Sequence, residues 1–246
     1  MPASPRARNI LITGTSRGIG LEFVRQYSAD PLITVLAACR HPAKADQLQL
    51  LAQQRPNIRL LAMDVSSEDS IQAAFAALPA DISTLDLLIN NAGIQSPKQP
   101  ADWILQARAA DALALFQTNV VGAMLATQFA LPLLTACTAN DPPATIVNVS
   151  STFGSLTLNT DTNNATYKLS KAALNQLTRS FAAALPTIAV VALSPGWVET
   201  DMGTKGGREP PLKVEQSVGG MRTLIERLGL EQSGRFFEWN GSELPW

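Results

Sequence analysis

The fold is decided by a stretch near the start of the chain, Asn9-Ile10-Leu11-Ile12-Thr13-Gly14-Thr15-Ser16-Arg17-Gly18-Ile19-Gly20. A short β-rich run ends at Thr13, a turn with three glycines follows, and residues 21–28 carry apolar side chains partly at helical spacing. Glycine lets the backbone turn sharply and approach a ligand without a Cβ in the way. The free N–H groups and positive dipole end of the following helix suit a pyrophosphate. The stretch predicts a strand, a glycine turn and a helix, and its G-x-x-x-G-x-G spacing leaves open that the turn binds no ligand.

Strand and helix patterns alternate along the rest of the chain, with no linker and no repeat. Further strands are expected at residues 32–39, 58–63, 85–89, 145–150, 188–193 and 234–238, and further helices at 68–78, 109–134, 165–185 and 214–228. This alternation is typical of a parallel sheet covered by helices on both faces. We therefore expect residues 1–246 to form one α/β domain, a single doubly wound Rossmann-type domain with a mostly parallel seven-stranded sheet.

Three local signals complete the expected chain path. Ser66 is expected to cap the helix that begins at Glu68, with Asp69 at the capping-box position. The stretch from Pro97 to Pro100 is expected to break the chain, and Asp141-Pro142-Pro143 is expected to form a turn. The glycine- and proline-rich segment at about 200–213 has the composition of a mobile lid over a substrate site.

The composition excludes several classes of protein. Apolar residues make up 46% of the chain and charged residues 16%, and the formal charge of −1 provides no basic footprint for nucleic acid. The first eight residues are polar and basic, and the apolar run that follows them is too short for a signal peptide. No apolar run approaches the roughly 20 residues that span a bilayer. Cys39 and Cys137 have neither metal-ligand spacing nor a CxxC pattern. We expect no metal, no membrane and a reducing, cytoplasmic setting.

The end of the second expected strand indicates which dinucleotide would bind. In dinucleotide-binding folds an acidic residue about 20 positions beyond the glycine turn binds the ribose 2′-OH, whereas an arginine accommodates a 2′-phosphate. The sequence offers Arg40 there and no carboxylate, and Arg17 in the glycine turn should point to the same region. Two guanidiniums can hold a phosphate dianion with charge-assisted hydrogen bonds. The pattern favours NADP(H), with two solvated surface arginines as the alternative.

The candidate chemistry lies between Ser151 and Lys171. Tyr167 and Lys171 are four residues apart, so on a helix they share one face, and Ser151 lies on the loop that leads to them. A phenol, an ammonium and a hydroxyl gathered in this way can move a proton onto or off a carbonyl oxygen. The alternative for the pair is an ordinary surface contact between successive helical turns. Asn119, inside an apolar helix, needs hydrogen-bond partners if it is buried.

In this order along the chain the motifs resemble those of the short-chain dehydrogenase/reductase family. The matching positions are Thr13-Gly14-x-x-x-Gly18-x-Gly20, Asp64, Asn90-Asn91-Ala92-Gly93, Asn119, Ser151, Tyr167-x-x-x-Lys171 and Pro195-Gly196-x-x-x-Thr200. Within the family the sequence resembles the branch of C-factor-like proteins and sniffer-type carbonyl reductases. The branch resemblance rests on residues 170–175, 195–203, 233–236 and 244–246.

The resemblance implies a role for each catalytic position. Tyr167 would be the general acid for carbonyl reduction and the base for the reverse reaction. As a base near neutral pH it would need its pKa lowered from about 10 by about 3 units, for which Lys171 and the oxidised nicotinamide are charges of the right sign. Lys171 would also hold the ribose hydroxyls, Ser151 would orient the substrate oxygen, and Asn119 would hold a water that continues the proton path.

The resemblance also implies the residues that line the cofactor. They are Gly14, Ser16, Arg17, Gly18, Ile19, Gly20, Arg40, Asp64, Val65, Asn91, Ala92, Gly93, Tyr167, Lys171, Pro195, Gly196, Val198 and Thr200. Asp64 and Val65 would flank the adenine, and Thr200 would meet the carboxamide. The segment between Ser151 and Tyr167 is longer than in the commonest members, and we expect its residues 159–164 to border the substrate site. Ser151 is chosen over Ser150 because it begins a Ser-x-x-Gly pattern.

Two functions from different classes follow. The first is an NADPH-dependent oxidoreductase that reduces an aldehyde or ketone, with an apolar pocket framed by Ile94, Phe153, Trp197 and Met202. The alternative for these four side chains is that each is an ordinary core residue. The alternative function is a dinucleotide-binding signalling or regulatory protein of the C-factor type, whose turnover is incidental. Family members often form homodimers or homotetramers through two long helices, here near 109–134 and 165–185, but monomers also occur.

Overall fold

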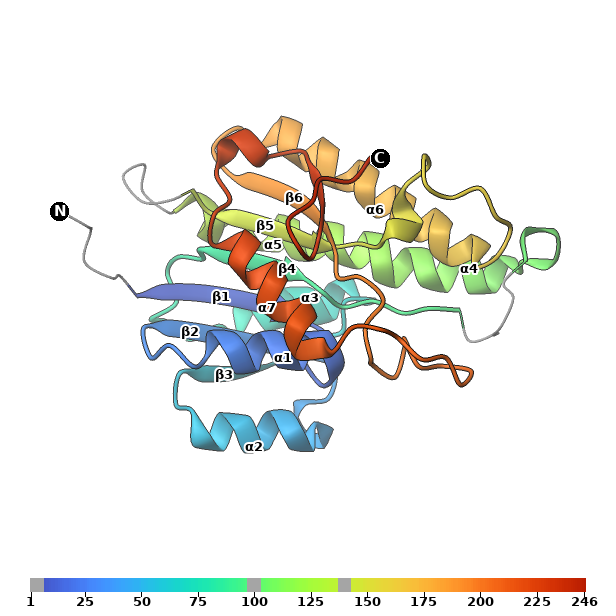
Figure 1. Ribbon diagram of the computed structural model, residues 1–246. Helices are drawn as coiled ribbons and strands as arrows, with labels where there is room; N and C mark the ends of the chain where they lie inside the picture. Colours follow the sequence, from blue (N-terminus) through green and yellow to red (C-terminus); the bar gives the residue numbers. More distant parts are fainter. Residues whose placement is uncertain (1–6, 97–102, 137–142) are drawn as a thin grey trace.

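The computed structural model describes residues 7–96, 103–136 and 143–246, and these form one α/β domain around a seven-stranded sheet (Figure 1). The strand order is β3-β2-β1-β4-β5-β6-β7, and each neighbouring pair runs parallel. The sheet was expected to be mostly parallel, and it is parallel throughout. The strands are β1 (Arg8–Thr13), β2 (Ile33–Cys39), β3 (Ile58–Ala62), β4 (Leu87–Asn90), β5 (Thr145–Val149), β6 (Ala189–Ser194) and β7 (Phe236–Glu238).

Helices cover both faces of the sheet and bury a separate apolar core on each. The helices are α1 (Gly18–Tyr27), α2 (Asp46–Gln54), α3 (Glu68–Ala76), α4 (Ala109–Phe116), α5 (Gly122–Thr135), α6 (Ala165–Ala184) and α7 (Val214–Ile225). One core joins the sheet to α1, α2 and α7, for example through Phe23, Leu48 and Met221. The other joins it to α3, α5 and α6, for example through Ile71 and Leu134. Burial on both faces explains why the central strands are continuous apolar runs.

The parallel arrangement places every strand's carboxyl end at the same edge of the sheet. Figure 1 shows this edge on the right, where the loops after β1, β4, β5 and β6 emerge. In open parallel sheets ligands bind outside this edge, near the point where the strand order reverses. Here the order reverses between β1 and β4, the strands that precede the glycine turn and residues 91–93.

The structure confirms the seven expected strands to within two residues at each end, and it corrects three details of the helices. Helix α2 was not expected, because only Leu48 and Leu51 of its residues are buried and its apolar signal is weak. The single helix expected at 109–134 is interrupted by the π-helical stretch η3 (Gln117–Val121). The cap of α3 is Ser67, whose hydroxyl accepts a hydrogen bond from the backbone N–H of Ser70, so the expectation for Ser66 was wrong.

The helical run Ala109–Thr135 is, by length and hydropathy alone, long and apolar enough to cross a membrane. The sequence argument, which looked only for an uninterrupted apolar run, did not anticipate this. In the structure Leu115, Ala126, Ala130 and Leu134 of the run are buried, and the last two belong to the core beneath the sheet. The run is therefore a core helix of the α/β domain. The expected chain break at 97–100 and the first two residues of the turn expected at 141–143 lie outside the described residues, as does Cys137.

Candidate active site

The candidate catalytic residues meet where helix α6 crosses the end of β5. Strand β5 ends at Val149, and Ser150 and Ser151 lead into the short turn η4 (Thr152–Gly154). Lys171 is 5% exposed and donates a hydrogen bond from Nζ to the carbonyl oxygen of Val149, 2.7 Å away. Its ammonium also lies 5.7 Å from the centre of the Tyr167 ring. The expected sharing of one helical face by Tyr167 and Lys171 is confirmed.

The two adjacent serines have different partners. Ser151 lies in extended backbone, its hydroxyl accepts a hydrogen bond from the N–H of Phe153 at 3.2 Å, and it also lies within hydrogen-bonding reach of the Tyr167 hydroxyl. Ser150 is 2% exposed and its hydroxyl donates to the side-chain oxygen of Asn175 at 2.6 Å. The geometry therefore supports the choice of Ser151 as the serine beside the phenol.

Burial sets the pKa of both ionisable side chains. Tyr167 is half-buried, and Phe153 packs edge-on against its ring at 6.2 Å. Burial raises the pKa of Tyr167 to about 12, and the hydrogen bond with Ser151 opposes this only in part. The fall that the sequence argument required of a base relied on Lys171 together with the oxidised cofactor, and in the protein without cofactor the loss of solvation dominates. Burial likewise lowers the pKa of Lys171 to about 8.

Asn119 is buried in the π-helical stretch and binds protein groups with both ends of its amide. Its oxygen accepts from the backbone N–H of Ile94 at 2.8 Å, and its nitrogen donates to the Ile94 carbonyl at 2.9 Å and to the Ser170 hydroxyl at 3.0 Å. Ser170 in turn donates to the Tyr167 carbonyl at 2.8 Å. The side chain of Asn119 therefore joins the loop after β4 to the helix that carries Tyr167. These bonds use both N–H donors of the Asn119 amide and one of the two lone pairs of its oxygen, and the water-holding role expected of Asn119 stays a prediction.

The glycine turn is pressed against the loop after β4. Gly14 has φ +72°, and a Cβ there would lie 2.7 Å from the Cα of Ala92. Gly20 is equally close-packed, since a Cβ there would lie 2.3 Å from the carbonyl oxygen of Gly14. Asn91 fixes the contact by donating to the carbonyls of Thr13 and Gly14 at 2.8 and 3.2 Å. These glycines are required by backbone packing as well as by any ligand.

The catalytic pair and the glycine turn are linked through Gly93. A Cβ at Gly93 would lie 3.3 Å from the amide oxygen of Asn119 and 3.8 Å from Nζ of Lys171. Ala92, its neighbour, packs on Gly14 as described above. The turn and the catalytic residues therefore border one region at the carboxyl edge of the sheet.

Thr13 has a structural role that the sequence reasoning did not assign. Its hydroxyl accepts hydrogen bonds from the backbone N–H groups of Asn91 and Ala92 at 3.1 and 3.0 Å. It thereby ties the last residue of β1 to the loop after β4. The signal was present in the sequence, since a hydroxyl residue ends the strand directly before the first glycine.

The predicted phosphate-binding residues lie at the surface. Arg17 is the N-cap residue of α1, in extended backbone, and its Nε lies 3.2 Å from the carboxylate of Asp201, with both side chains 75% exposed. Ser16 and Arg40 are also exposed, and Arg40 directly follows β2. Ile19 is partly buried against the core that contains α1. The cationic side chains therefore lie at the carboxyl ends of β1 and β2.

The two residues expected beside adenine have different environments. Burial would raise the pKa of Asp64, but hydrogen bonds from the hydroxyl and N–H of Ser66 outweigh it and hold the pKa below its usual range. Val65 is 7% exposed, and a Cβ on Gly122 of α5 would lie 2.5 Å from its carbonyl oxygen. The side chain of Val65 belongs mainly to the protein core.

The segment after β6 returns to the glycine turn. Gly196 has φ +78°, and the Pro195 carbonyl before it accepts a hydrogen bond from the Ser217 hydroxyl of α7 at 2.6 Å. Val198 is buried and forms an isolated β-bridge with Leu212. Thr200 lies beside the turn, since a Cβ on Gly18 would be 3.4 Å from its methyl group. The expected lid segment also contacts the loop after β4, because Lys205 donates to the Ser96 carbonyl at 3.2 Å.

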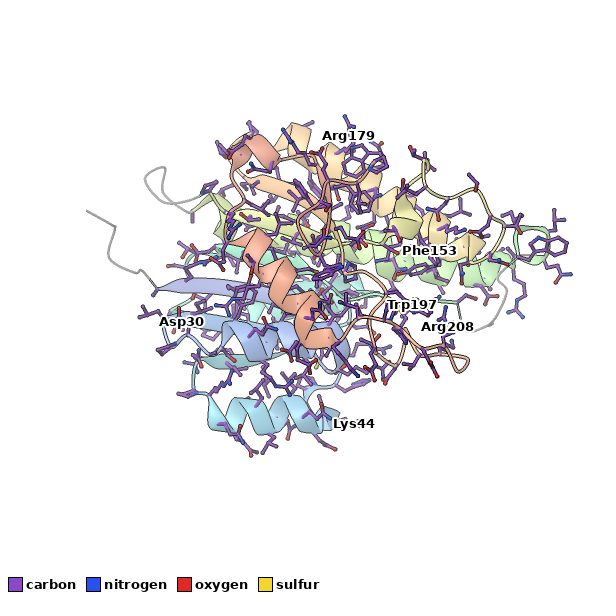
Figure 2. All side chains as sticks on the ribbon, in the orientation of Figure 1. Asp30, Lys44, Phe153, Arg179, Trp197 and Arg208 are labelled. Carbon is purple, nitrogen blue, oxygen red and sulfur yellow. The ribbon has the colours of Figure 1, made fainter. Side chains whose placement is uncertain are left out.

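Apolar side chains lie at the same edge. Figure 2 shows Phe153 and Trp197 on the right side of the view, where the carboxyl ends of the strands emerge. Trp197 and Met202 are 48% and 37% exposed, and Ile94 and Phe153 are partly buried. A cavity of about 360 Å³ exists elsewhere, lined by Ser28 and residues 54–57 at the amino edge of the sheet, and it shares none of these four side chains.

The long loop before α6 folds back onto the turn after β5. Asn159 donates to the carbonyls of Thr152 and Ser155 at 2.7 and 2.6 Å. Asp161 pairs with Lys168 at 2.7 Å, and that ammonium lies 5.2 Å from the centre of the Phe153 ring. Asn159 therefore contacts the turn after β5, and Asp161 pairs with the lysine that lies over Phe153, the ring that packs against Tyr167.

The sequence and the fold both match known proteins. A family model described as short chain dehydrogenase matches residues 8–210. The chain is 38% identical to the C-signal of Myxococcus xanthus over 166 residues, which cover 66% of this chain and 93% of that protein.

Two solved structures have closely similar folds. The NADPH-bound carbonyl reductase from chicken fatty liver superposes with a TM-score of 0.90 at 38% identity. The match covers 98% of this chain and 100% of the chicken protein. The carbonyl reductase Sniffer of D. melanogaster gives 0.90 at 34% identity, with 98% and 100% covered. The family model spans most of the chain, and in the structure the Tyr167/Lys171 pair and the glycine turn border one region. The protein therefore belongs to the short-chain dehydrogenase/reductase family.

Proposed function

We propose that this protein is an NADPH-dependent oxidoreductase that transfers a hydride between nicotinamide and a carbonyl or alcohol group, in the direction of aldehyde or ketone reduction. The observation that carries the proposal is the meeting of two hydroxyls, those of Tyr167 and Ser151, beside the ammonium of Lys171. The carbonyl reductases of similar fold, one of them with NADPH bound, support it.

The residues fit a dinucleotide phosphorylated at the 2′ position. The glycine turn brings backbone to backbone where any larger residue would collide, and it leads directly into the N-terminus of α1. The exposed Arg17 and Arg40 carry positive charge to the ends of β1 and β2, and no carboxylate ends β2. These residues would hold the cofactor, which supplies the hydride when bound.

Tyr167 acts as the proton donor to the carbonyl oxygen. A pKa of about 12 keeps the phenol protonated at neutral pH, and this is the form that a general acid needs. Ser151 donates a second hydrogen bond to the same oxygen and orients it. Lys171, whose pKa is about 8, is mostly charged at neutral pH and stabilises the phenolate after the proton has left.

The proposal is tested by adding purified protein to NADPH and a panel of aldehydes, diketones and quinones, and by following loss of NADPH absorbance. We expect turnover with at least one carbonyl, and we expect Tyr167→Phe to abolish it while NADPH still binds. Tyr27→Phe is the matched control, since the Tyr27 hydroxyl is buried with no hydrogen-bond partner among the described residues. NADPH binding without turnover across the panel would instead favour a regulatory protein, a possibility raised by the likeness to the C-signal of Myxococcus xanthus.

Three finer expectations belong to the same proposal. Residues 200–213 act as a lid that closes over the substrate. The protein works in the cytoplasm on a small molecule. It forms a homodimer or homotetramer through α4–α5 and α6, a prediction that light scattering of the purified protein can check.

A further inference from the structure

Asn175 is a buried polar residue that the proposed chemistry does not use. It lies on α6, one turn beyond Lys171 and two beyond Tyr167, so all three face the end of β5. Only 3% of Asn175 is exposed, and its oxygen accepts the short hydrogen bond from the Ser150 hydroxyl, at 2.6 Å. Three successive turns of α6 thus contact three successive residues, 149–151, at the end of the strand.

Asn175 also touches the other end of the turn that carries Ser151. A Cβ at Gly154 would lie 2.8 Å from the amide nitrogen of Asn175 and 2.8 Å from the Lys171 carbonyl. The Ser-x-x-Gly turn therefore rests directly on α6. Asn175 contacts it on both sides of Ser151, at Ser150 and at Gly154.

Stability alone gives little reason for an amide at this position. The side-chain nitrogen of Asn175 is buried and has no hydrogen-bond partner among the described residues. A buried donor without an acceptor has lost its hydrogen bond to water, and this cost offsets much of the bond from Ser150. Apolar residues of similar size at Ser150 and Asn175 would avoid that cost. What the pair does provide is a fixed direction for the Ser150 side chain, and hence for the peptide that joins it to Ser151.

We propose that Asn175 is a positioning residue, which acts through Ser150 to place the Ser151 hydroxyl against Tyr167 and the substrate carbonyl. The inference rests on the proposed function of Ser151 and Tyr167. It goes beyond that function in assigning a task to two residues that touch neither substrate nor cofactor.

The test compares Asn175→Leu, which removes the acceptor at similar volume, with Ser150→Ala, which removes the donor. Each variant should lower kcat by about 10- to 100-fold, the scale expected for a misplaced catalytic group, while NADPH affinity and KM stay near wild type. The double variant should be no worse than the more impaired single variant, because both remove one interaction.

Thr178→Val is the matched control. Thr178 is fully buried one turn further along α6, and it accepts a hydrogen bond from Asn148 of β5 at 2.9 Å, away from the Ser151 turn. Its loss should lower the free energy of unfolding but leave kcat unchanged. An equal fall of kcat in this control would assign Asn175 a merely structural role and overturn the proposal.

A second measurement is independent of turnover. The chain has two tyrosines, so protein labelled with ¹³C at the tyrosine Cζ gives two signals, which Tyr27→Phe assigns. Asn175→Leu should shift the Tyr167 signal, because the hydrogen bond with Ser151 changes, and Thr178→Val should not. An unchanged Tyr167 signal would overturn the proposal. Absence of turnover in the wild type would count against the proposed function, and the signal would still decide the role of Asn175.

Discussion

The ammonium of Lys171 donates a hydrogen bond to the carbonyl oxygen of Val149, although almost no solvent reaches it. No carboxylate pairs with it among the described residues, and burial lowers its pKa from the ordinary 10.5 to about 8. The protein therefore holds a cation beside the phenol at a cost in stability, as expected where a site is arranged for chemistry.

That cost predicts a pH-dependent effect of Lys171→Met. The folded-state pKa of Lys171 lies below the unfolded one, so between pH 8 and 10.5 the folded protein binds fewer protons and wild-type stability rises with pH. Met has no such dependence. The stability of the wild type relative to Lys171→Met should therefore increase by up to roughly 3 kcal/mol from pH 7 to pH 10.5. Urea unfolding of both proteins across this range measures it, and parallel curves would show that burial does not lower this pKa.

Close packing of the glycine turn predicts unequal effects for two similar substitutions. Gly14 and Gly206 have φ of +72° and +78°, but a Cβ at Gly14 would collide with Ala92 whereas one at Gly206 has nothing within 4 Å. Gly206→Ala should cost about 1–2 kcal/mol, the penalty for the left-handed conformation alone. Gly14→Ala should cost more and should also abolish NADPH binding. Denaturant unfolding and cofactor titration test both, and equal losses of stability would mean that the contact with Ala92 relaxes freely.

Much of the fold and the location of the site could be predicted from sequence. Strong apolar runs marked the strands, and the glycine turn, Asn91 and the Tyr167/Lys171 pair fall at the carboxyl edge because parallel strands all end there. Helix α2 was missed because it buries few apolar residues on an outer strand. The π-helical stretch was missed because an apolar helix has the same periodicity signal whether or not one turn is widened at Asn119.

Two features of the site have causes that lie outside any local sequence pattern. The Ser-x-x-Gly pattern selected Ser151, but it could not show that this turn packs on Asn175, which is distant in sequence from both serines. The pKa of Tyr167 without cofactor is the second feature, because sequence identifies the nearby charge but not how strongly burial of the phenol raises the pKa. Contacts between chain segments decide both features.

The exposed arginine after β2 predicts cofactor preference. Arg40→Asp should weaken NADPH binding by about 10- to 100-fold, because it removes charge-assisted hydrogen bonds to the 2′-phosphate, and should affect NADH much less. Arg59→Asp is the matched control, since Arg59 is an exposed residue near the amino end of β3 and its replacement changes net charge equally. Fluorescence titration with both cofactors measures the effect. Equal weakening of NADPH and NADH by Arg40→Asp would contradict the assignment of the 2′-phosphate to this residue.

The raised pKa of Tyr167 predicts different pH dependence for the two directions of reaction. Reduction uses the protonated phenol, which predominates at every pH well below 12, so wherever NADPH binding is saturated kcat/KM for a carbonyl should not rise from pH 6 to pH 9. It should stay level up to about pH 7 and fall above that, because Lys171, whose pKa is about 8, then loses the charge that stabilises the phenolate. Alcohol oxidation uses the phenolate, whose fraction rises tenfold per pH unit below the pKa, so its rate should climb through the same range. The bound cofactor's positive ring lowers the pKa of Tyr167 and moves the upper end of this rise in oxidation rate to lower pH without changing its direction.

Initial rates of reduction and of oxidation, with Ser151→Ala compared at each pH, measure this pH dependence. That variant loses the hydrogen bond that lowers the Tyr167 pKa, so its oxidation profile should shift to higher pH. An oxidation rate independent of pH would mean that Tyr167 does not accept the proton.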